Sequence, residues 1–83
     1  MYRDQTNDVL TSEFEGMAVI TLRGEWDVAS RDHLRRALQS IGLDQDVVVD
    51  LRQASFFDST ALGELIALYK RLDGAGHRVE ALV

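Results

Sequence analysis

The chain of 83 residues contains no cysteine and no proline. Without cysteine, disulfides, thiolate metal sites and a cysteine nucleophile are all excluded. No apolar run approaches the length of a membrane helix, and the first ten residues, MYRDQTNDVL, lack the apolar segment of a signal peptide. These absences predict a soluble cytoplasmic protein that does not insert into a membrane.

Basic residues are also scarce, with nine Lys and Arg against fourteen Asp and Glu and a net charge of −5. Nucleic-acid binding needs clustered cations to meet the phosphates. The only such cluster is Arg31, Arg35 and Arg36, which we interpret as a solvated helix face. His33 and His77 lie far apart, no carboxylate pairing marks them, and a metal motif such as H-E-x-x-H is missing. We therefore expect no nucleic-acid partner, no metal and no cofactor.

What the chain does contain is typical of one globular domain. Hydrophobic residues make up 46% and charged residues 28% of the sequence. The polar residues 1–8 are expected to fray. Val9–Phe14 alternates between apolar and polar residues, and Met17–Leu22 forms a second extended run. The turn signal Glu15-Gly16 between them predicts an antiparallel hairpin.

A loop is predicted over Arg23–Asp27, followed by a helix from about Ala29 to Ile41. Asp27 or Ser30 is expected to cap this helix, and Gly42 to stop it. Its apolar face recurs at helical spacing and consists of Leu34, Ala37, Leu38 and Ile41.

A strand, a helix and a last strand complete the chain. The β-branched run Val47–Leu51 predicts a strand buried on both faces. After the helix, Gly74-Ala75-Gly76 supplies the stop, and His77–Val83 is the last strand. The expected apolar face of this helix is Leu62, Leu65, Ile66, Tyr69 and Leu72. The predicted order is ββαβαβ, an α/β fold whose last three elements form a right-handed crossover.

The segment between the central strand and the second helix is the candidate site. Phe56-Phe57-Asp58-Ser59-Thr60 places two hydroxyl groups at a helix N-terminus, beyond the carboxyl end of a strand. By spacing alone, capping by one of the last three residues is the favoured role. We expect Phe56 in the core and Phe57 as a partly exposed contact.

An enzymatic role is not favoured. A nucleophilic Ser59 would need a general base, and the adjacent Asp58 is poorly placed to act as one. The chain has no G-x-S-x-G elbow and no phosphate-cradling glycine loop. We predict a protein that binds and does not catalyse.

The run SFFDSTALGELIALYKRL, residues 55–72, resembles the signature of the STAS domain, the family of bacterial anti-sigma factor antagonists. Three further segments resemble the family in order and spacing: Leu22–Asp27 (LRGEWD), Val47–Leu51 (VVVDL) and Gly76–Val83. The resemblance covers nearly the whole chain and implies a mixed sheet flanked by helices in a non-enzymatic binding module. Two departures are Ala61, where the family often has glycine, and the lack of the further helix and strand with which family members usually continue.

The resemblance also implies a phosphorylation switch at Ser59, the serine directly after the motif's aspartate. An anti-sigma factor that is a serine kinase would phosphorylate it. The unphosphorylated form binds the anti-sigma factor and frees sigma, whereas the phosphorylated form does not bind. The partner-binding residues expected on this basis are Asp27, Phe57, Asp58, Ser59, Thr60 and Glu64.

Several alternatives stay open at the level of sequence. The family also includes scaffold parts of stress-signalling complexes and accessory subunits of lipid transporters, which would need no phosphorylation. Trp26 is either an interface anchor or packed over the hairpin, and Asp27 either joins an acidic surface or caps a helix. The short C-terminus predicts a homodimer or a swapped dimer, because part of the sheet would otherwise be uncovered.

Overall fold

The structure, a computed structural model of the chain, describes residues 7–83. In chain order its elements are β1 (Asp8–Phe14), β2 (Met17–Trp26), the 3-10 turn η1 (Val28–Ser30), α1 (Arg31–Gln39), β3 (Val47–Asp50), β4 (Ala54–Phe57), α2 (Ser59–Gly74) and β5 (Val79–Leu82). The expected fraying of residues 1–8 falls mainly on residues 1–6, outside the described part. The predicted α/β class with a mixed sheet is confirmed, and one strand, β4, is added to the predicted order.

The first two strands form the predicted antiparallel hairpin, with Phe14 opposite Met17. Its turn residues, Glu15 and Gly16, have φ of 51° and 82°. Positive φ at both central positions matches the twist of a two-residue hairpin. Glycine takes this conformation at little cost, which explains why the local sequence was sufficient to locate the turn.

The strands form a five-stranded sheet in the order β1-β2-β3-β5, with β4 pairing the far end of β2. β2 runs parallel to β3 and to β4. The predicted loop over Arg23–Asp27 is therefore wrong, because β2 continues to Trp26. Its extension is held by β4, whose Phe57 pairs with Trp26. Gly24, with φ of 94°, lies where the register shifts.

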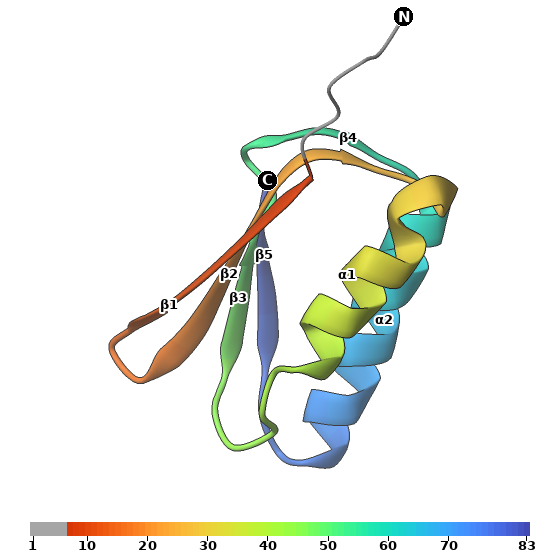
Figure 1. The fold of residues 1–83 in the computed structure, drawn as a ribbon. Helices are drawn as coiled ribbons and strands as arrows, with labels where there is room; N and C mark the ends of the chain where they lie inside the picture. The colour runs from red at the N-terminus through yellow and green to blue at the C-terminus, as the bar shows by residue number, and fades with distance from the viewer. Residues whose placement is uncertain (1–6) are drawn as a thin grey trace, which may run out of the picture.

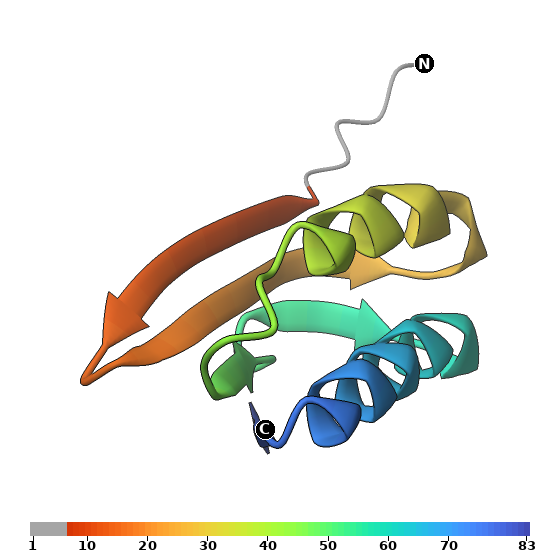
Figure 2. The same cartoon turned by 90° about the horizontal axis from the view of Figure 1, so that it is seen from below.

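Both helices cover the same face of the sheet, so the molecule has two layers (Figures 1 and 2). The core between them consists of Ile20, Leu22, Trp26, Leu34, Leu38, Val47, Val49, Ala61, Leu65, Leu68 and Leu72. Val48 points to the opposite face and is only half-buried, since neither helix covers it. The prediction that this strand is buried on both faces is therefore wrong. As expected, no helix follows α2 within residues 7–83, and none of the described helices is long and apolar enough to span a bilayer.

The first helix is shorter than predicted. It begins at Arg31 after a separate 3-10 turn and ends at Gln39, two residues before the predicted end. The Ser40 N–H donates to the carbonyls of Arg36 and Leu38, so the last turn closes before Gly42. Leu34 and Leu38 are buried as expected.

The face that the second helix buries matches the predicted one only in Leu65 and Leu72. Its buried residues are Ala61, Leu65, Leu68 and Leu72. Leu62, Ile66 and Tyr69 instead remain 50%, 45% and 51% exposed. Apolar residues occupy two adjacent stripes of this helix, and periodicity alone does not show which stripe faces the sheet. The end at Gly74 is confirmed, and Gly76 has φ of 85° in the following turn.

Candidate functional site

The N-terminus of α2 is attached to the end of β2 through backbone contacts. Ser59 is the first residue of α2 and follows β4 after one residue. The Asp58 N–H donates to the Trp26 carbonyl at 3.2 Å. Phe57, the last residue of β4, therefore lies at the same end of the sheet as Asp27 and Asp58, which follow β2 and β4. This is the place where open α/β sheets usually bind ligands.

Asp58 caps α2 and leaves the Ser59 hydroxyl free. An Asp58 carboxylate oxygen accepts from the Ala61 N–H at 3.0 Å. Ser59 is exposed, and its hydroxyl makes no hydrogen bond within residues 7–83, whereas Thr60 is half-buried. Of the three residues that spacing allowed as the cap, only Asp58 has that role. The accessible hydroxyl of the pair is therefore Ser59.

Asp27 caps the 3-10 turn η1 and not α1, whose N-cap residue Ser30 makes no side-chain cap hydrogen bond. Its Oδ1 accepts from the N–H groups of Ala29 and Ser30 at 3.0 and 3.3 Å. The Ser30 hydroxyl oxygen in turn accepts from the Asp27 N–H at 2.9 Å. This reciprocal pair fixes the chain as it leaves β2, so Asp27 shapes the loop beside the α2 N-terminus.

Trp26 lies in the core and is not an interface anchor. Its side chain is completely buried, and its Nε1–H donates to the Arg23 carbonyl at 3.1 Å. The ring centroid lies 5.2 Å from that of His33. Burial of Trp26 follows from the extension of β2, which carries it under the helices.

Glu64 forms an ion pair with a residue of α1 and does not contribute an unpaired carboxylate to an acidic surface. Arg35 donates from Nε to Oε1 at 3.2 Å and from Nη2 to Oε2 at 2.9 Å. These hydrogen bonds lower the pKa of the Glu64 carboxyl, and its side chain is only 14% exposed. Arg35, interpreted as part of a solvated face, stays 43% exposed but is also paired with Glu64. The ion pair was not visible in sequence because its partners lie 29 residues apart.

Of the two phenylalanines before the site, Phe56 does not lie in the core as predicted, whereas Phe57 is partly exposed as predicted. Phe56 is 52% exposed, whereas Phe57 is half-buried against the core. Both residues belong to β4, in which successive side chains point to opposite faces. The exposure of Phe56 follows from the pairing of β4 with β2, which a loop assignment could not anticipate.

Two further charged pairs, Asp50 with Arg52 and Asp46 with His77, were not predicted from the sequence. The Asp50 carboxylate accepts both side-chain hydrogen bonds of Arg52, at 2.9 Å each, and its pKa falls to about 2 mainly through these bonds. His77 Nδ1 lies 3.1 Å from the Asp46 carboxylate, so the expectation that no carboxylate pairs with it is wrong. These clusters do not hold enough ligands for a metal, and no metal-binding group of side chains occurs among residues 7–83.

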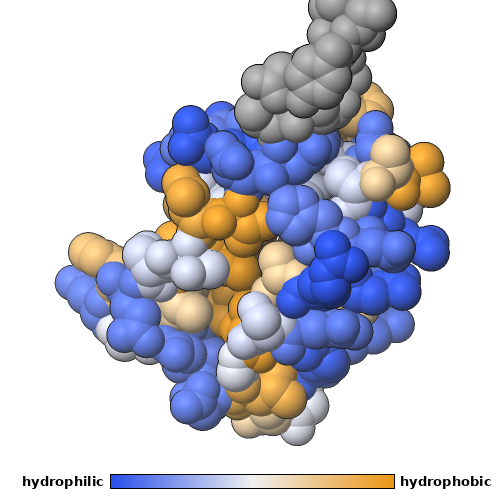
Figure 3. Space-filling model, viewed as in Figure 1, coloured by the Kyte–Doolittle hydropathy of each residue, from blue (hydrophilic) through white to orange (hydrophobic). Residues whose placement is uncertain are grey.

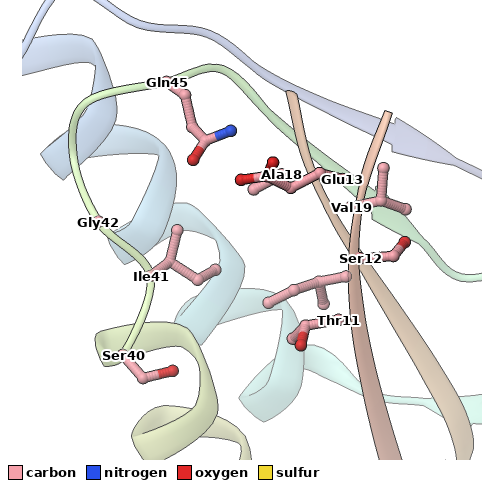
Figure 4. A pocket seen from close by; sticks show the side chains of 10 residues that line it. Thr11, Ser12, Glu13, Ala18, Val19, Ser40, Ile41, Gly42 and Gln45 are labelled. Atoms are coloured by element: carbon pink, nitrogen blue, oxygen red, sulfur yellow. The ribbon is translucent and has the colours of Figure 1, made fainter. Parts of the chain in front are cut away.

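A groove of about 320 Å³ lies at the opposite end of the sheet from Ser59. Figure 3 shows apolar surface at the bottom of this hollow, between the hairpin and the first helix. Ile41 and Glu13 point into it from opposite walls (Figure 4). The groove exists because the hairpin extends beyond the helices, and it shares no lining residue with the candidate site.

Comparison with known proteins identifies the family of the chain. Residues 10–82 match the protein family described as "Mlab, STAS domain". The chain belongs to the STAS family. Among curated protein sequences none matches this chain.

Solved structures share the fold of this STAS domain. An anti-sigma factor antagonist from Mycobacterium paratuberculosis has 26% identity and a TM-score of 0.78, over 98% of this chain and 72% of the other. An antisigma-factor antagonist STAS domain from Rhodobacter sphaeroides has 16% identity and a TM-score of 0.74, over 92% and 85% of the two chains. The phosphorylated form of the Bacillus cell fate determinant SpoIIAA has 18% identity and a TM-score of 0.67, over 87% and 68%. This STAS domain is thus similar to anti-sigma factor antagonists.

Proposed function

We propose that this STAS domain is a cytoplasmic anti-sigma factor antagonist, controlled by phosphorylation of Ser59. In its unphosphorylated form it binds an anti-sigma factor, which releases the sigma factor. The observation that carries this proposal is the free, exposed Ser59 hydroxyl at the start of α2, beside a half-buried Thr60. The similarity to a structure solved in a phosphorylated form is consistent with control by phosphorylation.

The local chemistry suits a switch that needs no refolding. Asp58 already caps the helix, so Ser59 carries no hydrogen bond that phosphorylation would break. A phosphoryl group adds about −1.5 to −2 charge, and the free amides of the first helical turn tolerate it. A partner that buries neutral Ser59 would have to desolvate this charge. Changing a partner from almost fully bound to almost fully free takes about 5.5 kcal/mol. The desolvation cost of burying one charge is of that order.

The surface proposed for the anti-sigma factor is built around this serine. Phe56, exposed at the end of β4, replaces Phe57 as the aromatic contact. Ser59 remains the central residue, with Asp58 and Thr60 as its neighbours. Asp27 and Glu64 act indirectly, because they position the loop and the two helices. The role is one of binding, without catalysis.

The test is intact mass on protein isolated from its native cells, with and without phosphatase treatment. We expect a phosphate-sized shift in the parent chain and in Thr60→Ala, and its loss in Ser59→Ala. Thr60 is the matched control because it is the adjacent hydroxyl residue. Absence of the shift under every growth condition would remove the switch from the proposal.

Identification of the bound partner separates the proposal from its alternative. Ser59→Ala is expected to retain an anti-sigma factor and Ser59→Asp to lose it, as measured by mass spectrometry of captured proteins. The alternative is a STAS scaffold or an accessory subunit of a stress-signalling complex or a lipid transporter. The family description "Mlab, STAS domain" names no sigma-factor role and keeps this alternative open. Equal capture of a transporter or stress-complex subunit by both variants would favour it.

A further inference from the structure

The outer side of α2 presents an apolar stripe that no described segment covers. We define the α2 stripe as Leu62, Ile66 and Tyr69, which are about half exposed. The first helix lies along one side of α2 and the sheet lies along another (Figure 2). Glu64, which binds Arg35 of that first helix, marks the inner side of α2. The stripe lies on the side turned away from α1.

The spacing of the stripe is that of a helix-packing seam. Together with Ser59 and Asp73 at its ends, it repeats at intervals of three and four residues. This is the interval at which two helices pack side by side through an apolar seam. A helix is therefore the element that fits the stripe.

The two ends of the seam carry opposite electrostatic character. At the Ser59 end lie the free amides of the first turn, where the helix dipole is positive. At the other end Asp73 places a carboxylate in the last turn, where the dipole is negative. A second α2 in antiparallel orientation would bring its Asp73 towards the positive end, and its Lys70 towards Asp58. A parallel orientation would instead place the two Asp73 carboxylates together.

The adjoining edge of the sheet leaves room for such a helix. β5 is the edge strand, and Ala81 pairs with the buried Val49, so both side chains point to the side that the helices cover. Ala81 nevertheless remains exposed. The helix layer thus stops short of the sheet edge next to the α2 stripe.

We propose that two copies of this chain associate through their α2 stripes, with the two helices antiparallel. In this arrangement Leu62 of one copy packs beside Ile66 of the other, and Tyr69 beside Ser59. The helix of 16 residues is about 24 Å long at 1.5 Å per residue. Three half-exposed side chains offer less than a standard interface of about 800 Å² per partner. The dimer is therefore weak and its population depends on concentration.

The absence of cysteine allows a direct test by disulfide trapping. Leu62→Cys and Ile66→Cys are prepared in the full chain, one with a mass tag, and oxidised mildly alone and as a mixture. We expect more cross-linked product from the mixture than from either variant alone, because positions 62 and 66 face each other only in an antiparallel pair. Leu43→Cys and Val28→Cys, at exposed apolar residues outside α2, give the background from random collision.

The outcomes are separate from those of the phosphorylation experiment. Cross-linking no greater than that of Leu43→Cys overturns the proposal and leaves the stripe to another partner. Stronger cross-linking of each variant with itself than with the other overturns the antiparallel arrangement. In sedimentation, Ile66→Glu should abolish a concentration-dependent dimer that Val28→Glu retains, with circular dichroism confirming that both are folded. Both measurements use unphosphorylated protein, so their results do not depend on whether Ser59 is phosphorylated in cells.

Discussion

Arg35 and Glu64 join the N-terminal halves of the two helices through a pair of parallel hydrogen bonds of 3.2 and 2.9 Å. A guanidinium that meets a carboxylate in this way fixes direction as well as distance. Arg35 lies in the second turn of α1, and Glu64 lies in the second turn of α2. The pair therefore sets how the two helix starts lie against each other, and Ser59 is at one of them.

Arg35→Ala should lower the free energy of unfolding modestly. The arginine side chain is 43% exposed, so solvent screens the pair and only a small loss is expected. Urea titrations at low and high salt measure it, and the difference between the variant and the parent should shrink as salt rises. Arg36→Ala, at an exposed position of the same helix, is the control. An equal loss in both variants would show that helix propensity, not the pair, is responsible.

Asp58→Ala should destabilise the domain by about 1 kcal/mol, because it removes the acceptor for the Ala61 N–H. Asp58→Asn should restore most of that stability, since its side-chain oxygen also caps a helix. Thermal melts followed by circular dichroism make the comparison. If Asp58→Asn keeps stability but loses the partner, the charge of Asp58 also serves binding. Unchanged stability in Asp58→Ala would contradict the capping role.

Phe57→Ala and Phe56→Ala should separate stability from binding. Phe57 packs against the core, and its removal should cost about 2 kcal/mol or more in the free energy of unfolding. Phe56 is largely exposed, and its removal should change stability by less than about 0.5 kcal/mol. Denaturation followed by the fluorescence of Trp26, the single tryptophan, measures both effects. The proposed anti-sigma factor contact predicts weaker partner capture by Phe56→Ala, and a larger stability loss there would contradict this assignment.

Asp50 should contribute to the acid sensitivity of the fold. Its pKa is about 2 in the folded chain, below the ordinary value of 3.8, so folding favours the ionised carboxylate. The stabilisation is complete above about pH 4 and is lost as the pH falls from 4 towards 2. Asp50→Asn should therefore be less stable than the parent at pH 7, with a gap that narrows towards pH 2. Urea titrations at several pH values measure this gap, and a constant gap would refute the assignment.

The sequence by itself determined the elements that depend on interactions between neighbouring residues. The hairpin turn follows from Glu15-Gly16, and the end of α2 from the glycines around residue 75. Ser59 could be placed at the start of a helix because a β-branched strand and an apolar periodicity surround it. The STAS assignment also came from sequence, since four segments keep their order and spacing.

Only the tertiary structure decided which surfaces face each other. β4 forms because it pairs with β2 some 30 residues earlier, and this pairing buries Trp26 and leaves Phe56 exposed. The choice between two apolar stripes of α2 depends on where the sheet lies, and Arg35 meets Glu64 only once the helices are parallel neighbours. Periodicity within one element specifies that a face is apolar. Long-range contacts determine which apolar face is buried and which remains free for a partner.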